Sequence, residues 1–102
     1  MNILKTGHLY ELESLEGTNN QLIQFIEKEQ IDGAFKTVND GTTNEEVLAV
    51  LIDRCKILGE KLPSRENSIA VTKLEEALMW FNKRTENRLK QNVENTPLPH
   101  NS

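Results

Sequence analysis

Hydrophobic and polar positions alternate in short runs over the first forty residues, with turn sequences between the runs. The run at 8–15 reads HLYELESL and alternates imperfectly with a period of two, and the run at 21–29 reads QLIQFIEKE and contains branched and aromatic residues. The sequences GTNN at 17–20 and IDG at 31–33 are typical of turns, and AFKTV at 34–38 forms a third short run. This pattern predicts a small antiparallel meander of three strands, which needs another element to cover one face.

The run at 21–29 also fits a short amphipathic helix. Leu22, Phe25 and Ile26 recur at helical spacing. The branched side chain of Ile23, together with the turn sequence before the run, favours a strand. We predict the strand, and the helix remains the alternative.

Helical periodicity begins after the turn sequence NDG at 39–41. Thr42 and Glu45 have the spacing of a capping box, in which the Thr42 hydroxyl accepts a hydrogen bond from the Glu45 N–H. Gly59 and Pro63 end this helix. Its apolar positions follow spacings of 1, 3, 4 and 3 and form one predicted buried stripe: Val47, Leu48, Leu51, Cys55 and Leu58.

A second helix begins at the predicted cap Ser64 and continues to about Lys90. A connection of roughly five residues joins the two helices, which favours an antiparallel helical hairpin. The predicted inward stripe of the second helix consists of Ala70, Leu74, Ala77, Leu78 and Phe81.

Together the elements predict an α+β fold: a small N-terminal antiparallel β unit followed by a long antiparallel helical hairpin. We expect one compact domain with a β-rich segment at 1–40, the helical hairpin at 41–91 and a flexible tail at 92–102, since the tail contains two prolines. A chain of 102 residues is too short for a multi-domain enzyme or for a deep cavity of its own.

Composition excludes several classes of protein. Charged residues make up 27% of the chain and hydrophobic ones 36%, and no apolar run reaches the roughly 18 residues that cross a bilayer. The N-terminal sequence lacks the apolar core of a signal peptide, and the chain has one cysteine. We therefore expect a cytoplasmic protein with no membrane partner.

The net charge of −4 is unevenly distributed along the chain. Residues 1–53 contain three lysines against ten acidic residues, whereas residues 54–102 contain nine basic residues against six acidic ones. An acidic chain of this kind does not coat DNA or RNA, so we expect no nucleic-acid partner. The second half retains enough positive charge for a local site that binds a small anion.

No sequence motif supports catalysis, a cofactor or a metal ion. The sequence contains no HExxH, CxxC or GxSxG motif and no phosphate-cradling glycine loop. His8 and His100 lie near opposite ends of the chain, and Cys55 falls on the predicted buried stripe, where a thiol is inert. The adjacent acids at 45–46 and at 75–76 point apart on a helix. We therefore expect no catalytic residue, no cofactor and no metal site.

Trp80, Arg84 and Arg88 recur at i, i+4 and i+8, so they share a helix face about 12 Å long, distinct from the predicted buried stripe. Arginine binds phosphate through paired hydrogen bonds, and tryptophan offers a plane on which a base stacks. This face fits a reader of phosphates and a base. The alternative is a solvated face on which an arginine pairs with an acid such as Glu76 or Asp53.

The start of the second helix, SREN at 64–67, offers a weaker anion site, which simple capping explains equally well. Asn67 and Arg84 are 17 positions apart, which separates them by about 25 Å along one helix. One small ligand contacts both residues only if a second copy lies alongside the first. Such a pair is an antiparallel two-fold dimer with two identical pockets.

The stretch at 40–96 resembles the helical-hairpin domain shared by two families of phage immune-evasion proteins, the Thoeris anti-defence sponges and the anti-CBASS cyclic-nucleotide sponges. The recognisable pieces are, in order, TNE at 43–45, LIDR at 51–54, REN at 65–67, EALMW at 76–80 and RT at 84–85 with Arg88. The β-rich segment before the hairpin is more similar to the Thoeris-type sponges. Relatives often carry GVEGT after the last arginine, whereas this chain has NVENT at 92–96, without either glycine.

The resemblance implies a protein that binds a cyclic nucleotide immune signal without cleaving it, so that the downstream effector is never activated. In the Thoeris-type sponges the ligand is a cyclic ADP-ribose isomer held between two protomers, and some members form hexamers that hold cyclic di- or trinucleotides. The family's pocket arginines correspond to Arg84 and Arg88, and its pocket asparagine corresponds to Asn67. Trp80 and Arg54 complete the expected ligand-binding set.

We therefore expect a non-enzymatic homodimer or hexamer in the cytoplasm of an infected bacterial host. Two alternatives stay open: a sponge for the cyclic di- or trinucleotides of CBASS-type defence, and a helical-hairpin module that binds another protein. A hydrolase or lyase acting on the same signal has less support, because no general base or metal set is visible in the sequence.

Overall fold

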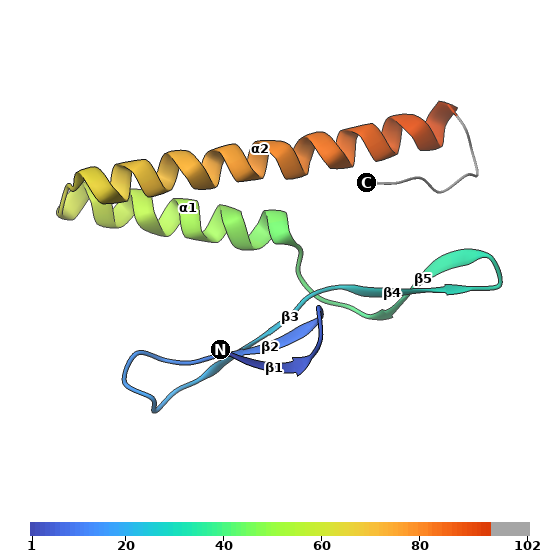
Figure 1. The fold of residues 1–102 in the computed structure, drawn as a ribbon, viewed down its shortest axis with the longest axis horizontal. Helices are drawn as coiled ribbons and strands as arrows, with labels where there is room; N and C mark the ends of the chain where they lie inside the picture. Colours follow the sequence, from blue (N-terminus) through green and yellow to red (C-terminus); the bar gives the residue numbers. More distant parts are fainter. Residues whose placement is uncertain (95–102) are drawn as a thin grey trace. The chain divides into compact units, whose positions relative to one another are not determined.

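The computed structural model describes the backbone of residues 1–94 and the side chains of residues 1–91. Two compact units divide the chain (Figure 1): Met1–Asn44 contains five strands, and the unit that begins at Glu45 consists of two helices. The predicted α+β fold, with an antiparallel β unit followed by a helical hairpin, is confirmed. Within the described residues, neither helix has an apolar stretch able to cross a membrane.

The five strands form two antiparallel sheets, so the prediction of a single three-stranded meander is wrong. One sheet contains three strands in the order β1-β2-β3, and the other is a two-stranded hairpin of β4 and β5. The strands are β1 (Asn2–Lys5), β2 (Leu9–Leu12), β3 (Gln21–Gln24), β4 (Glu27–Ile31) and β5 (Ala34–Asn39). β1 was not predicted, because its four residues NILK carry too little alternation to indicate a strand.

The second predicted strand is extended, so its helical alternative is wrong, but it breaks at Phe25 into β3 and β4. At the break, Phe25 pairs with Thr42 in an isolated parallel bridge. The Thr42 N–H donates to the Gln24 carbonyl at 2.8 Å, and the Ile26 N–H donates to the Thr42 carbonyl at 2.9 Å. Gly41 permits this crossing, since a Cβ there would collide with the backbone of Gln24 and Phe25.

One face of the three-stranded sheet is apolar. Ile3 and Ile23 lie directly opposite Tyr10 on the two neighbouring strands. The Tyr10 ring meets the Phe25 ring edge-on, with ring centroids 6.0 Å apart. Ile3 remains exposed, so this face is only partly covered within its unit.

Two helices follow, α1 (Asn44–Lys61) and α2 (Arg65–Glu94), joined by three residues rather than by the five predicted. Because α1 begins at Asn44, Thr43 occupies its N-cap position. The capping role predicted for Thr42 is therefore wrong, since Thr42 lies in the bridge to the sheet. The predicted cap of α2 is confirmed, because Ser64 Oγ accepts a hydrogen bond from the Asn67 N–H at 3.0 Å.

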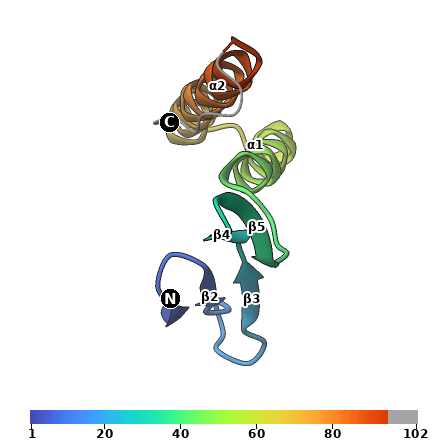
Figure 2. The ribbon, with the colours of Figure 1, turned by 90° about the vertical axis from the view of Figure 1, so that its right-hand side faces the viewer.

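The two helices lie side by side along a narrow seam (Figure 2). On α1 the apolar residues that are buried or half-buried are Val47, Leu48, Ile52, Cys55 and Gly59. Ile52 is the most buried apolar residue described, at 9% exposure. The predicted α1 stripe is confirmed at Val47, Leu48 and Cys55 and wrong at Leu51 and Leu58, which are exposed.

On α2 the seam is formed by half-buried residues at helical spacing, namely Asn67, Val71, Leu74, Ala77, Leu78 and Phe81, whereas the predicted Ala70 is exposed. An ion pair of 3.0 Å between Lys56 and Glu75 links the two helices beside the seam. α2 is twelve residues longer than α1. Its C-terminal end therefore extends about 18 Å beyond α1 (Figure 1). We call residues 83–94 the α2 extension.

Candidate functional site

Trp80, Arg84 and Arg88 all lie on α2 at the predicted helical spacing. Trp80 is 67% exposed, whereas both arginines are half-buried. The predicted separation of this face from the buried stripe is wrong for the arginines. Arg84 lies seven residues after Ala77, and Arg88 lies seven after Phe81, so both arginines continue the line of the seam into the α2 extension.

The Arg84 guanidinium is held against an aromatic ring. Its Cζ lies 5.7 Å from the centroid of the Phe81 ring, a cation–π contact. Its Nε is enclosed and has no hydrogen-bond partner among the residues that the structure describes. Nε has almost no exposed surface, so an anion would have to be bound by the terminal N–H groups of this half-buried side chain.

Asn67 connects the two helices near the turn of the hairpin. Its Nδ2 donates a hydrogen bond to the carbonyl oxygen of Cys55 at 2.8 Å. Gly59 leaves room for this contact, since a Cβ there would lie 2.8 Å from Asn67 Nδ2. Asn67, which the sequence analysis predicts as a ligand residue, therefore also has a structural role that its position in the sequence did not indicate.

This contact predicts a coupled effect of two substitutions. Asn67→Ala should lower the free energy of unfolding by about 1 kcal/mol, because it removes a hydrogen bond between the helices. Gly59→Ala alone should change stability little, because the helix propensity of Ala, worth about 1 kcal/mol over Gly, is offset by displacement of the Asn67 side chain. In the Asn67→Ala background, Gly59→Ala should instead raise the free energy of unfolding, because no Asn67 side chain is then displaced. Urea unfolding of the wild type, the two single variants and the double variant measures this coupling. Strictly additive changes in the free energy of unfolding would contradict the prediction.

A single chain does not bring Asn67 and Arg84 together. Both residues lie on one continuous helix and are 17 positions apart, so about 25 Å of helix separates them. The distance predicted from the sequence therefore holds in the structure. A site that uses both residues requires a second copy of the chain.

Arg54 lies in the middle of an exposed apolar surface of α1. Val50, Leu51, Ile57 and Leu58 precede or follow it by three or four positions, and each is between 40% and 60% exposed. We call these five residues the outer face. Exposed apolar clusters of this kind often mark interaction surfaces in proteins.

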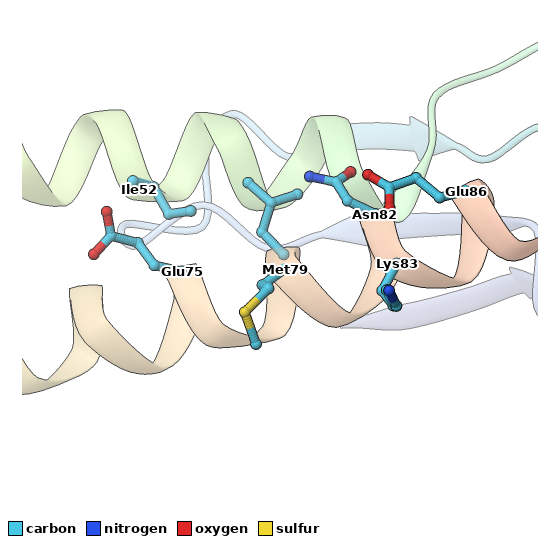
Figure 3. A pocket seen from close by; sticks show the side chains of 7 residues that line it. Ile52, Glu75, Met79, Asn82, Lys83 and Glu86 are labelled. Atoms are coloured by element: carbon cyan, nitrogen blue, oxygen red, sulfur yellow. The ribbon is translucent and has the colours of Figure 1, made fainter.

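Two of the hollows among the described residues of the helical hairpin bear on the predicted ligand residues. The first, of about 500 Å³ (Figure 3), is lined by Ile52, Glu75, Leu78, Met79, Asn82, Lys83 and Glu86. It contains none of the five predicted ligand residues, and two carboxylates against one lysine make it unsuited to an anion. The second hollow, of about 420 Å³ near the hairpin turn, includes Asn67 but neither Arg84 nor Arg88.

The sequence analysis did not predict that the residues lining the first hollow form a site. Met79, Asn82, Lys83 and Glu86 recur at helical spacing on one flank of α2, and that spacing is the signal that could have identified them. Among the described residues, no group of three His, Cys, Asp or Glu side chains is placed to hold a metal ion.

Residues 26–86, more than half of the chain, match the family described as "Acb2/Tad1, hairpin domain". The chain belongs to the Acb2/Tad1 hairpin-domain family. The predicted resemblance to phage anti-defence sponges is thereby confirmed. The part that matches the Acb2/Tad1 family includes four of the five predicted ligand residues and ends two positions before the fifth, Arg88.

A curated protein named "Thoeris anti-defense 1", from Bacillus phage SBSphiJ7, is 47% identical to this Acb2/Tad1 family member over 58 residues. The aligned part covers 56% of this chain and 41% of the relative. The chain therefore matches less than half the length of that relative, and the similarity concerns one shared part.

Proposed function

We propose that this chain binds and sequesters a cyclic nucleotide immune signal during phage infection of a bacterium, with a cyclic ADP-ribose isomer as the preferred ligand. Binding without cleavage lowers the free signal, so the downstream effector stays inactive. Membership of the Acb2/Tad1 family and the name of the phage relative support an anti-defence role. The ligand proposal rests on Arg84, a half-buried guanidinium that lies beside the Phe81 ring and is followed one turn later by Arg88.

The chemistry of the α2 residues fits an anion that carries a base. A guanidinium presents five N–H donors, and a pyrophosphate presents several oxygen acceptors. Arg88 lies one helical turn beyond Arg84, so a second guanidinium reaches the same anion. Trp80 is largely exposed and offers a flat surface on which a base stacks. This set supports recognition of phosphate and base together.

A second copy of the chain would complete the pocket. In an antiparallel two-fold dimer, the Asn67 end of one copy lies beside the Arg84 end of the other, which creates two identical pockets. The outer face supports this assembly, because covering apolar surface stabilises a chain with a small core. Hexamers are proposed on the resemblance to the family alone.

Sequestration acts by mass action, so it requires tight binding. When the free protein is 100-fold above its Kd, about 1% of the signal remains free. Arginines fixed on a helix lose less conformational entropy on binding than arginines on a loop, which favours high affinity. The function therefore requires affinity and abundance, and no bond needs to be broken.

Isothermal titration calorimetry of the full chain tests the proposal. We expect saturable binding of a cyclic ADP-ribose isomer at two ligands per dimer, and recovery of the intact ligand after the complex is heated. Tighter binding of cyclic di- or trinucleotides would favour the CBASS-type alternative. Recovery of a hydrolysed or rearranged product would refute sequestration without cleavage.

A protein-binding module is the second candidate function. The exposure of Trp80 on α2 favours it, because Trp residues often dominate protein interfaces. Capture of a stoichiometric host protein from lysate, with no nucleotide released on denaturation, would support this candidate over the first.

A further inference from the structure

The least exposed residue that the structure describes is a carboxylate in the β unit. Glu27, at the start of β4, is 5% exposed. Its Oε2 lies 2.7 Å from Nζ of Lys5 on β1. Its Oε1 accepts hydrogen bonds from Lys5 Nζ at 2.8 Å and from Nδ2 of Asn39 on β5 at 2.9 Å. We call these three residues the Glu27 cluster, and it connects strands of two separate sheets.

The β4–β5 hairpin has few other contacts that hold it in place. Every residue of β4 after Glu27 and every residue of β5 is exposed. Asp32 and Gly33 have φ values of 52° and 80°, as a tight hairpin turn requires, but this turn fixes only the hairpin itself. A two-stranded hairpin is at best marginally stable alone. Its attachment to the three-stranded sheet therefore depends on the chain crossing at Phe25 and on the Glu27 cluster.

The attachment depends on the charge of one carboxylate. The hydrogen bonds from Lys5 and Asn39 are the main causes of a lowered pKa for Glu27, and they outweigh the opposing effect of burial. His8 is the other titratable group that acts on Glu27, and its enclosed Nδ1 has no hydrogen-bond partner among the described residues. Protonation of Glu27 would remove the ion pair with Lys5 and one acceptor oxygen from an enclosed site.

We propose that the Glu27 cluster is an electrostatic lock, which fixes the β4–β5 hairpin to the three-stranded sheet and releases it as a mobile arm when the carboxylate loses its charge. The three-stranded sheet does not need the lock, because its strands are joined by their own backbone hydrogen bonds. This role is independent of ligand binding by the helices.

The pH range of the lock follows from the direction of the pKa shift. The pKa of Glu27 is lower in the folded chain than in the unfolded one, so its stabilisation is fully present above the ordinary pKa of a glutamate. The stabilisation is lost as the pH falls through the lowered value. The lock therefore holds at neutral pH, and acid or substitution opens it.

Hydrogen exchange of the full chain, followed by NMR, tests the lock at neutral pH. Glu27→Gln keeps the shape of the side chain and removes its charge. We expect exchange of the β4–β5 amides to accelerate about tenfold or more, while the β2–β3 amides change less than about twofold. Glu29→Gln is the matched control, since it removes an exposed carboxylate from the same strand and should leave the hairpin unchanged. Wild-type exchange rates for the hairpin in Glu27→Gln would overturn the proposal.

An acid titration of the wild-type chain provides the second test, which remains available if Glu27→Gln does not fold. The carboxyl carbon of Glu27 should titrate at a lower pH than the ordinary value for a glutamate. Amides of β4–β5 should lose protection in the same pH range, before those of β2–β3, once rates are corrected for intrinsic exchange. Simultaneous loss of protection in both sheets would contradict a lock that acts on the hairpin alone.

Discussion

Arg84→Ala is expected to lower the affinity for a cyclic ADP-ribose isomer by about 100-fold or more, without loss of helical content. The guanidinium lies beside the Phe81 ring with its Nε enclosed, so a phosphate bound there is partly removed from water, where a charge-assisted hydrogen bond is strong. Truncating one partner of such a contact costs about 2–5 kcal/mol, which corresponds to roughly 30-fold to several-thousand-fold in Kd. Isothermal titration calorimetry measures the change directly.

Lys83→Ala is the matched control for this substitution. It removes a cation from the neighbouring position on the same helix, but its side chain lines the hollow on another flank of α2 (Figure 3). We expect its affinity to change by less than about fivefold, as for other exposed charges. Arg88→Ala should behave like Arg84→Ala. Unchanged affinity in both arginine variants, with circular dichroism showing folded protein, would remove the arginines from the ligand site.

Ile52→Ala is expected to lower the free energy of unfolding by about 2–4 kcal/mol, the range for truncating a buried Ile to Ala. Ile52 is the most buried apolar residue described, and the seam around it is formed by half-buried side chains. The seam therefore has little other packing that could compensate. For a chain of this size, the loss should lower Tm by roughly 10 °C or more, measured by thermal unfolding at 222 nm.

Val50→Ala tests whether a second copy of the chain covers the outer face. Val50 lies two positions before Ile52 on α1 but belongs to the exposed outer face. In a monomer its truncation should change stability by less than about 0.5 kcal/mol. A loss that grows with protein concentration would indicate that another copy covers the outer face. An Ile52→Ala variant as stable as the wild type would show that the seam is not the core of the hairpin.

Features that depend on neighbouring residues could be predicted from the sequence. Ser64 caps α2 as expected, because a cap hydroxyl and the N–H it binds are three positions apart. The turn at Asp32 and Gly33 follows from the positive φ that Asp-Gly sequences tolerate. The α+β order, with strands before a helical hairpin, follows from the change of hydrophobic period along the chain.

Features that depend on distant residues could not be predicted. The run around Phe25 reads as one strand, and its division into β3 and β4 depends on Thr42 and Gly41, which lie more than ten positions away. α1 is apolar around more than half of its circumference, so its pattern does not indicate which residues meet α2. Leu51 and Ile52 are equally hydrophobic neighbours, and only the position of α2 decides that Ile52 is buried.

The candidate site, like the fold, was predicted from the sequence only in part. The types and spacing of Trp80, Arg84 and Arg88 indicated a polar cluster on one helix, and they lie on α2. Two details were missed because both depend on side chains that pack in three dimensions. Arg84 rests against Phe81 rather than on a separate face, and the amide of Asn67 is bonded to Cys55 across the hairpin.

The α2 extension bears on the proposed binding of a signal, because Arg84 and Arg88 both lie on it. One continuous helix fixes the spacing of these two arginines through its backbone hydrogen bonds. If the proposed ligand needs both arginines at this spacing, any opening of the helix between them lowers the apparent affinity by the fraction of molecules in the open state. The helix propensity of α2 residues that do not contact the proposed ligand would therefore influence its apparent affinity.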